Sequence, residues 1–211
     1  MDDDRIYNLL IAGVGGQGAL FAAEVTALAA VRAGFDVKQT EVHGVSQRGG
    51  SVETHLRFGA QVWSPIVTPG EADVVFGLEK LEALRFASFL HPERGLLLAN
   101  DFEVIPGSVT GADESYPHHA FEFLRGKGLR LIVLPASTMA RDLGDGRMAN
   151  IVLTGALSAL LPIPHEVWLD TLRARLPEKY RSANLQAFAA GRQAVGERAT
   201  ETVAHEERSL R

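Results

Sequence analysis

The sequence has 211 residues, of which 46% are hydrophobic and 22% are charged, and its formal net charge is −5. This length allows one α/β domain of ordinary size, and the negative charge argues against an electrostatic nucleic-acid binder, which would present a basic face. Cysteine is absent, which excludes disulfides, thiolate zinc sites and ordinary cysteine-ligated iron–sulfur clusters in this chain.

The first half of the chain alternates between strand and helix patterns. Residues 6–12 are apolar on both faces, which predicts a buried strand, and the Ala-rich stretch 19–33, closed by Gly34, predicts a helix. Residues 36–41 predict a second strand. In residues 51–58 apolar and polar side chains alternate, as expected for a strand with one buried face.

The alternation continues through the middle of the chain. Residues 73–76 predict a short buried strand and residues 79–90 a helix, and further apolar strands are expected at 96–99 and 131–134. Strands that alternate with helices favour a parallel sheet covered on both faces. We therefore predict an α/β fold with a Rossmann-like, doubly wound, mostly parallel sheet.

The last third of the chain is helical in pattern. Residues 148–161, 165–176 and 182–195 predict three helices, which form a helical C-terminal section. Residues 196–211 are charged and poor in apolar side chains, so we expect a mobile tail, or a segment that becomes ordered on a partner. The prediction is a single domain over residues 1–195 followed by this tail.

No part of the sequence predicts membrane insertion or export. The first residues are acidic and lack a signal-peptide pattern, and the longest apolar runs, near residues 6–12 and 151–161, are too short to span a bilayer. We expect a cytoplasmic protein that binds neither membranes nor nucleic acid.

A glycine-rich turn stands between the first predicted strand and the first helix. Its sequence, Gly-Val-Gly-Gly-Gln-Gly, has the spacing G-x-G-x-x-G. Glycines allow a tight turn and let backbone amides approach a phosphate at the positive end of the helix. The alternative is a turn that only packs closely and binds nothing. The candidate binding residues are Gly13, Gly15, Gly16, Gln17 and Gly18.

A nicotinamide or flavin site would also need an acidic residue about 20 residues beyond this turn. Asp36 opens the second predicted strand and Glu41 closes it, so Glu41 is a candidate ribose partner. However, Glu41 leads directly into an unusual loop that a dinucleotide-binding module does not need. A free-standing NAD- or flavin-binding oxidoreductase therefore stays open as an alternative.

That loop, residues 41–52, combines hydrogen-bonding side chains with three glycines. Arg48, followed by Gly49 and Gly50, is suited to hold an anion through its guanidinium group and bare backbone amides. The alternative is a polar surface hairpin. The candidate site residues of the loop are His43, Ser46, Gln47, Arg48, Gly49 and Gly50.

Other chemistry-bearing residues give weaker signals. Asn150 begins an apolar helix and is a further candidate for the site, with a hydrogen bond to core backbone as the alternative. The histidines lack the spacing of a metal site, so none is predicted. The sequence does not identify a catalytic residue.

The glycine turn followed by the 41–52 loop resembles the gamma domain of pyruvate and other 2-oxoacid:ferredoxin oxidoreductases. Within this family, the run from Glu41 to Val52 is particularly similar to the beta subunit of indolepyruvate oxidoreductases. The resemblance continues through residues 63–65, 70–73 and 81–85 and covers most of the chain to about residue 161.

The resemblance implies a division of labour between subunits. A larger alpha subunit would carry thiamine diphosphate, magnesium and iron–sulfur clusters, decarboxylate an arylpyruvate such as indolepyruvate, and pass electrons to ferredoxin. Coenzyme A would take up the acyl group. This chain would be the small, cofactor-free subunit, inactive alone, with its glycine turn and loop facing coenzyme A or the partner. A purely architectural subunit is the other alternative.

Overall fold

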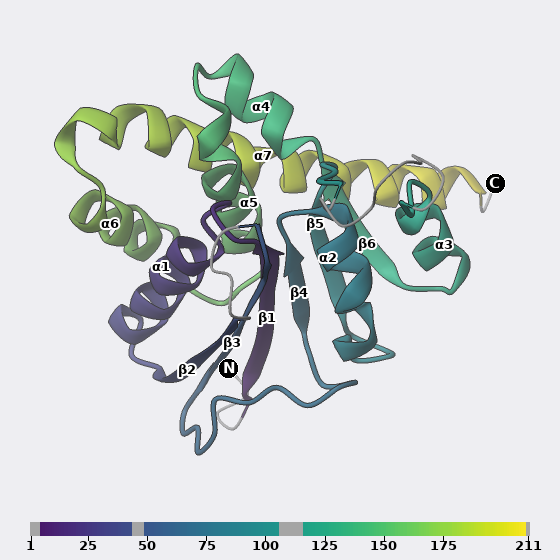
Figure 1. Ribbon diagram of the computed structural model, residues 1–211, viewed down its shortest axis with the longest axis horizontal. Helices are drawn as coiled ribbons and strands as arrows, with labels where there is room; N and C mark the ends of the chain where they lie inside the picture. The colour runs from purple at the N-terminus through teal and green to yellow at the C-terminus, as the bar shows by residue number, and fades with distance from the viewer. Residues whose placement is uncertain (1–4, 44–48, 106–115, 210–211) are drawn as a thin grey trace.

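The computed structural model of the chain describes residues 5–43, 49–105 and 116–209 (Figure 1). Within these residues a six-stranded sheet lies between two layers of helices. The strands are β1 (Tyr7–Val14), β2 (Asp36–His43), β3 (Ser51–Gly59), β4 (Val74–Gly77), β5 (Leu96–Asn100) and β6 (Arg130–Leu134).

The strand order is β2-β3-β1-β4-β5-β6. Strands β1, β4, β5 and β6 pair in parallel, whereas β3 runs antiparallel to both of its neighbours, β2 and β1. The predicted mostly parallel sheet is therefore confirmed. The insertion of β3 between β2 and β1 was not predicted, because the alternation in residues 51–58 shows a half-buried strand but not its partners.

The helices in chain order are α1 (Ala19–Arg32), α2 (Lys80–Arg85), α3 (Ala120–Gly126), α4 (Ala136–Asp142), α5 (Ala149–Ser158), α6 (His165–Arg175) and α7 (Glu178–Ser209), with 3₁₀ turns η1 (Ala87–Phe89) and η3 (Gly146–Met148). The helix predicted over residues 79–90 is thus a shorter helix followed by a 3₁₀ turn. The helical C-terminal section is confirmed, and α7 extends into the segment for which a mobile tail was predicted. The mobility of that segment stays a prediction.

Both faces of the sheet are buried, which explains why β1 is apolar throughout. Leu9 and Ile11 belong to a large core that β1 shares with α1, α5, α6 and α7, whereas Leu10 and Ala12 belong to a second core with α2 and α3. Successive side chains of a strand point to opposite faces, so an uninterrupted apolar run is needed where helices cover both sides. The doubly wound arrangement predicted from the sequence is thereby confirmed.

Helix α5 lies between the sheet and α7, and every residue from Asn150 to Ser158 is buried. The two helices approach closely at two glycines. A Cβ atom on Gly155 would overlap the backbone carbonyl of Phe188, and one on Gly191 would overlap the carbonyl of Val152. The absence of side chains at these positions therefore sets the distance between α5 and α7.

Candidate functional site

The glycine turn lies at the carboxyl end of β1. The helices that follow β1 and its parallel neighbour β4 pack on opposite faces of the sheet at this point. Helix α1 follows β1 on one face, and α2 follows the adjacent parallel strand β4 on the other face. Open α/β sheets bind ligands in the crevice that such an arrangement creates. Gly16 and Gly18 have φ angles of 104° and 85°, so the turn needs glycine at both positions.

Gln17 closes the turn on itself. Its backbone amide donates to the carbonyl of Val14 at 3.0 Å, and its side-chain oxygen accepts from the backbone amide of Val14 at 2.8 Å. The side-chain oxygen of Gln17 therefore holds the turn in shape.

Asn150 contacts the turn from α5, 132 residues further along the chain. Its side-chain amide donates to the carbonyl of Gly18 at 3.3 Å, and only 7% of the residue is exposed. A Cβ atom at Gly18 would overlap the Asn150 amide nitrogen. Gly18 is thus required both by its backbone conformation and by the side chain packed on it.

The structure also brings the two predicted glycine segments together. The amide of Gly15 donates to the carbonyl of Gly50 at 2.8 Å, and the amide of Gly49 donates to the carbonyl of Gly15 at 3.3 Å. The candidate residues Ser46, Gln47 and Arg48, and the side chain of His43, lie outside the part of the chain that the structure describes. Their roles stay predictions.

Hollows lie on both sides of the turn. One, of about 380 Å³, runs along the start of α1, which no side chain caps, and includes Gly16, Leu20 and Glu41. The other, of about 290 Å³, includes Gln17, Asn100, Phe102 and Arg147. An uncapped helix N-terminus carries partial positive charge and free amides, so this crevice suits an anionic ligand.

Glu41 lines the hollow beside α1, but the strand that carries it does not have the position expected in a dinucleotide site. A Rossmann-type site places its acidic residue on the strand beside β1, whereas β3 separates β1 from the strand that carries Glu41.

A buried acid that sequence reasoning missed lies two residues after the end of β4. Glu79 is 1% exposed; one carboxylate oxygen caps α2 by accepting from the amide of Glu82 at 2.9 Å. The other accepts from the amide of Val104 at 3.0 Å and from the hydroxyl of Tyr116. Burial and this carboxylate raise the pKa of Tyr116 far above its usual value. The only signal in the sequence is a polar pair, Glu79 and Lys80, after a buried strand.

Glu82 links α2 to the end of the 41–52 loop. The hydroxyl of Ser51, the first residue of β3, donates to one carboxylate oxygen, and Arg85 lies 3.3 Å from the other. Glu82 is 4% exposed, and this burial raises its pKa although the hydrogen bond from Ser51 acts in the opposite direction.

The raised pKa of Glu82 predicts a pH-dependent stability. The folded protein keeps a proton on Glu82 over a range of pH in which the unfolded chain has released it, so the wild type loses stability as the pH rises through that range. Glu82→Gln removes this loss. Thermal melts from pH 5 to 8 should show the melting temperature of the variant gaining on that of the wild type as the pH rises.

Glu93→Gln, at an exposed position, is the control for the loss of one negative charge. If the difference between Glu82→Gln and wild type stayed constant over this pH range, Glu82 would titrate as an ordinary carboxyl group.

Within the described residues, no three His, Asp or Glu side chains gather in a way that could hold a metal ion. In the same part of the chain, no helix is both long and apolar enough to cross a membrane.

The glycine turn and the hollows beside it lie in a domain that other proteins share. Residues 8–194 match the pyruvate ferredoxin/flavodoxin oxidoreductase family, and the chain belongs to this family. The predicted relationship to 2-oxoacid:ferredoxin oxidoreductases is therefore confirmed.

One curated relative is the indolepyruvate oxidoreductase subunit IorB of Archaeoglobus fulgidus. It is 39% identical over 188 residues, which cover 87% of this chain and 92% of the relative. Because this similarity extends over nearly the whole of both chains, a free-standing NAD- or flavin-binding enzyme is not favoured.

Solved structures share the fold. The gamma subunit of a keto/oxoacid ferredoxin oxidoreductase from Geobacter sulfurreducens PCA superposes with a TM-score of 0.67 at 23% identity, covering 90% of this chain and 98% of that one. The 2-oxoglutarate:ferredoxin oxidoreductase of Magnetococcus marinus, solved with 2-oxoglutarate, coenzyme A and succinyl-CoA bound, gives a TM-score of 0.71 at 21% identity. The match covers 92% of this chain and 32% of that chain. The same domain thus occurs as a separate chain and as part of a longer one.

Proposed function

We propose that the chain is the small subunit of an indolepyruvate-type oxidoreductase, which converts an arylpyruvate to an acyl-CoA with release of carbon dioxide and transfer of electrons to ferredoxin. The observation that carries this proposal is the similarity to subunit IorB, which covers nearly the full length of that relative. The complex would operate in the cytoplasm.

The redox chemistry is assigned to a larger partner subunit. The chain contains no cysteine, so it offers no ordinary ligand set for an iron–sulfur cluster. Thiamine diphosphate, magnesium and the clusters would therefore belong to the partner, which decarboxylates the 2-oxoacid and passes electrons to ferredoxin. The role of this chain would be to bind and orient the acyl acceptor at the interface.

We propose that the glycine turn and the first amides of α1 bind the phosphates of coenzyme A. The support is the uncapped positive end of α1, the two glycines of positive φ, and the hollows on both sides of the turn. The Magnetococcus marinus enzyme, which contains this fold, was solved with coenzyme A bound.

The same edge of the molecule carries exposed apolar side chains that suit a protein interface. Leu20 at the start of α1, Val42 at the end of β2, and Phe102 and Ile105 after β5 are all exposed. Leu20 lies in the first turn of α1 and Val42 near the end of β2, whereas the other two residues follow β5. All of these positions are at the carboxyl edge of the sheet, where the glycine turn also lies. Apolar side chains gathered near a ligand crevice favour burial against a partner subunit.

The test is to purify the chain alone and in complex with its larger subunit. We expect the isolated chain to be colourless and inactive, and the complex to oxidise indolepyruvate with coenzyme A and ferredoxin faster than it oxidises pyruvate or 2-oxoglutarate. A bound chromophore in the isolated chain, or turnover without the partner, would contradict the division of labour. A clear preference for a non-aromatic 2-oxoacid would contradict the substrate class.

A further inference from the structure

Trp63 is the most exposed of the large hydrophobic side chains in the described part of the chain, at 84%. It lies with Ile66, which is 51% exposed, in the segment that joins β3 to β4 and passes the amino edge of the sheet, opposite the glycine turn (Figure 1). Single exposed apolar side chains are common on protein surfaces. Trp63 is distinguished by the rigid turn that carries it and by the hollow beside it.

The turn around Trp63 is held by hydrogen bonds to two neighbouring strands. The amide of Val62 donates to a carboxylate oxygen of Asp36, at the start of β2, at 2.8 Å, and Val62 is only 1% exposed. The guanidinium Nη1 of Arg57, in β3, donates to the carbonyl of Ser64 at 3.0 Å. Because the backbone on both sides of Trp63 is already fixed, a partner that binds the ring does not have to order the turn.

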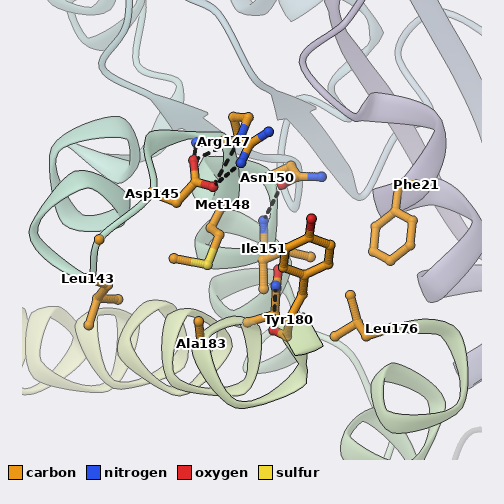
Figure 2. Close-up of a pocket in the computed structure, with 12 residues that line it drawn as sticks. Phe21, Leu143, Asp145, Arg147, Met148, Asn150, Ile151, Leu176, Tyr180 and Ala183 are labelled. Carbon is orange, nitrogen blue, oxygen red and sulfur yellow. Dashed lines mark hydrogen bonds and ion pairs between the residues drawn. The ribbon is translucent and has the colours of Figure 1, made fainter. Parts of the chain in front are cut away.

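A hollow of about 640 Å³ lies beside the ring of Trp63, which forms part of its wall. The other residues that line it are Ile6, Asp36, Ala60 and Gln61. This hollow shares no residue with the one that Phe21 and Tyr180 line between α1, α5 and α7 (Figure 2). The patch formed by Trp63 and its hollow is therefore separate from the crevice at the glycine turn.

The ring and the hollow complement each other chemically. The indole Nε1–H of Trp63 can only donate, and the hollow offers two acceptors, the side-chain oxygen of Gln61 and the carboxylate of Asp36, whose side chain is 34% exposed. The hydrogen bonds from Lys38 and from the amide of Val62 hold the pKa of Asp36 below its usual value. Asp36 is therefore ionised at neutral pH, and a carboxylate has room for more than two donors.

A ring and a matching hollow side by side on one surface are what a two-fold contact requires. In such an interface a residue of one copy contacts a second residue of the other copy, and the reverse contact occurs as well, so the patch has to complement itself. An unrelated protein would have to supply both a projecting ring and a recess at the same spacing. The occupant that the patch itself specifies is a second copy of this chain.

We propose that two copies of the chain associate through this patch, each inserting Trp63 into the hollow of the other, with the indole N–H donating to the acceptors there. Tryptophan is enriched among the central interface residues whose truncation weakens binding most. The inference does not depend on the proposed substrate. Since the patch lies at the amino edge of the sheet, the carboxyl edge of each copy stays open to a larger subunit.

The test is analytical ultracentrifugation of the full chain at micromolar concentrations, with tryptophan fluorescence measured on the same samples. The chain has two tryptophans, and Trp168 is fully buried. We expect a dimer, and as it forms the emission of Trp63 should shift to the blue and become less sensitive to acrylamide. Trp63→Ser should weaken dimerisation at least tenfold. Phe123→Ser, at an exposed position of α3, is the matched control and should leave it unchanged.

A mixing experiment tests the reciprocal contact. Ala60 lines the hollow and is exposed, so Ala60→Arg should fill the hollow and weaken dimerisation while leaving Trp63 in place. A mixed pair of Trp63→Ser and Ala60→Arg chains keeps one intact ring and one intact hollow that face each other. We therefore expect the mixture to associate more tightly than either variant alone.

A wild-type chain that stays monomeric throughout this range, or a dimer whose affinity Trp63→Ser leaves unchanged, overturns the inference. Protection of Trp63 from acrylamide only after the larger subunit is added also overturns it and assigns the patch to that subunit. If Ala60→Arg does not fold, Trp63→Ser and the fluorescence of the wild type decide the question.

Discussion

Gly155→Ala should lower the melting temperature of the chain by roughly 6–12 °C. The added Cβ would overlap the carbonyl of Phe188, a backbone atom that cannot rotate away. Relief requires α5 and α7 to separate, although α5 is buried from Asn150 to Ser158 between the sheet and α7. Overpacking of a core costs about 1–3 kcal/mol, and a clash with backbone belongs at the upper end, at about 2–4 °C per kcal/mol for this size.

The measurement is a thermal melt of the purified chain with two comparison variants. Gly191→Ala, the reciprocal contact against the carbonyl of Val152, should have an effect of similar size. Gly196→Ala lies on the same helix with open space around its Cβ and should stabilise by about 0.5–1 kcal/mol, because alanine is the better helix former. If Gly155→Ala melted at the wild-type temperature, the helix crossing would have to be looser than described.

The second large effect is expected at the glycine turn. Gly16→Ala should raise the KM for coenzyme A at least tenfold in the reconstituted complex, while decarboxylation measured without coenzyme A is spared. At a φ of 104° an alanine is strained, so the turn should relax and move its amides away from the phosphates. A loss of 1.4 kcal/mol of binding is sufficient for a factor of ten.

The structure makes Gly16 a sharper test than Gly18. A Cβ at Gly16 meets no atom within 4 Å, whereas one at Gly18 overlaps the side chain of Asn150. Weaker activity in Gly18→Ala would therefore not separate phosphate binding from packing. Melts and acyl-transfer kinetics of Gly16→Ala on one preparation do separate them: a lower melting temperature with an unchanged KM for coenzyme A would leave the turn with a packing role only.

Local sequence patterns determined much of the fold. The apolar run in β1 predicts burial on both faces, and the glycine spacing places a turn with left-handed residues before α1 because few other residues adopt positive φ. Helical periodicity likewise predicted the C-terminal helices. The family was predicted from the resemblance of the turn and the 41–52 loop to known members, and the family match over residues 8–194 confirms it.

Contacts between distant segments were decided only by the tertiary structure. The alternation in residues 51–58 is compatible with any neighbouring strand, so the insertion of β3 beside β1, and with it the place of Glu41, could not be predicted. The burial of Glu79 and Glu82 depends on Tyr116 and Ser51, which no local pattern connects to α2.

The same reason applies to the helix crossing and to the contact of Asn150 with the glycine turn. A glycine within a helical pattern, such as Gly155, shows nothing of the carbonyl packed against it until α7 is in place. Asn150 was a candidate from the sequence, but its bond to Gly18 joins residues 132 positions apart. A hollow lined by Phe21 and Tyr180 exists only because folding brings α1, α5 and α7 together. Periodicity shows that a helix face is apolar, but it does not show which other face packs against it.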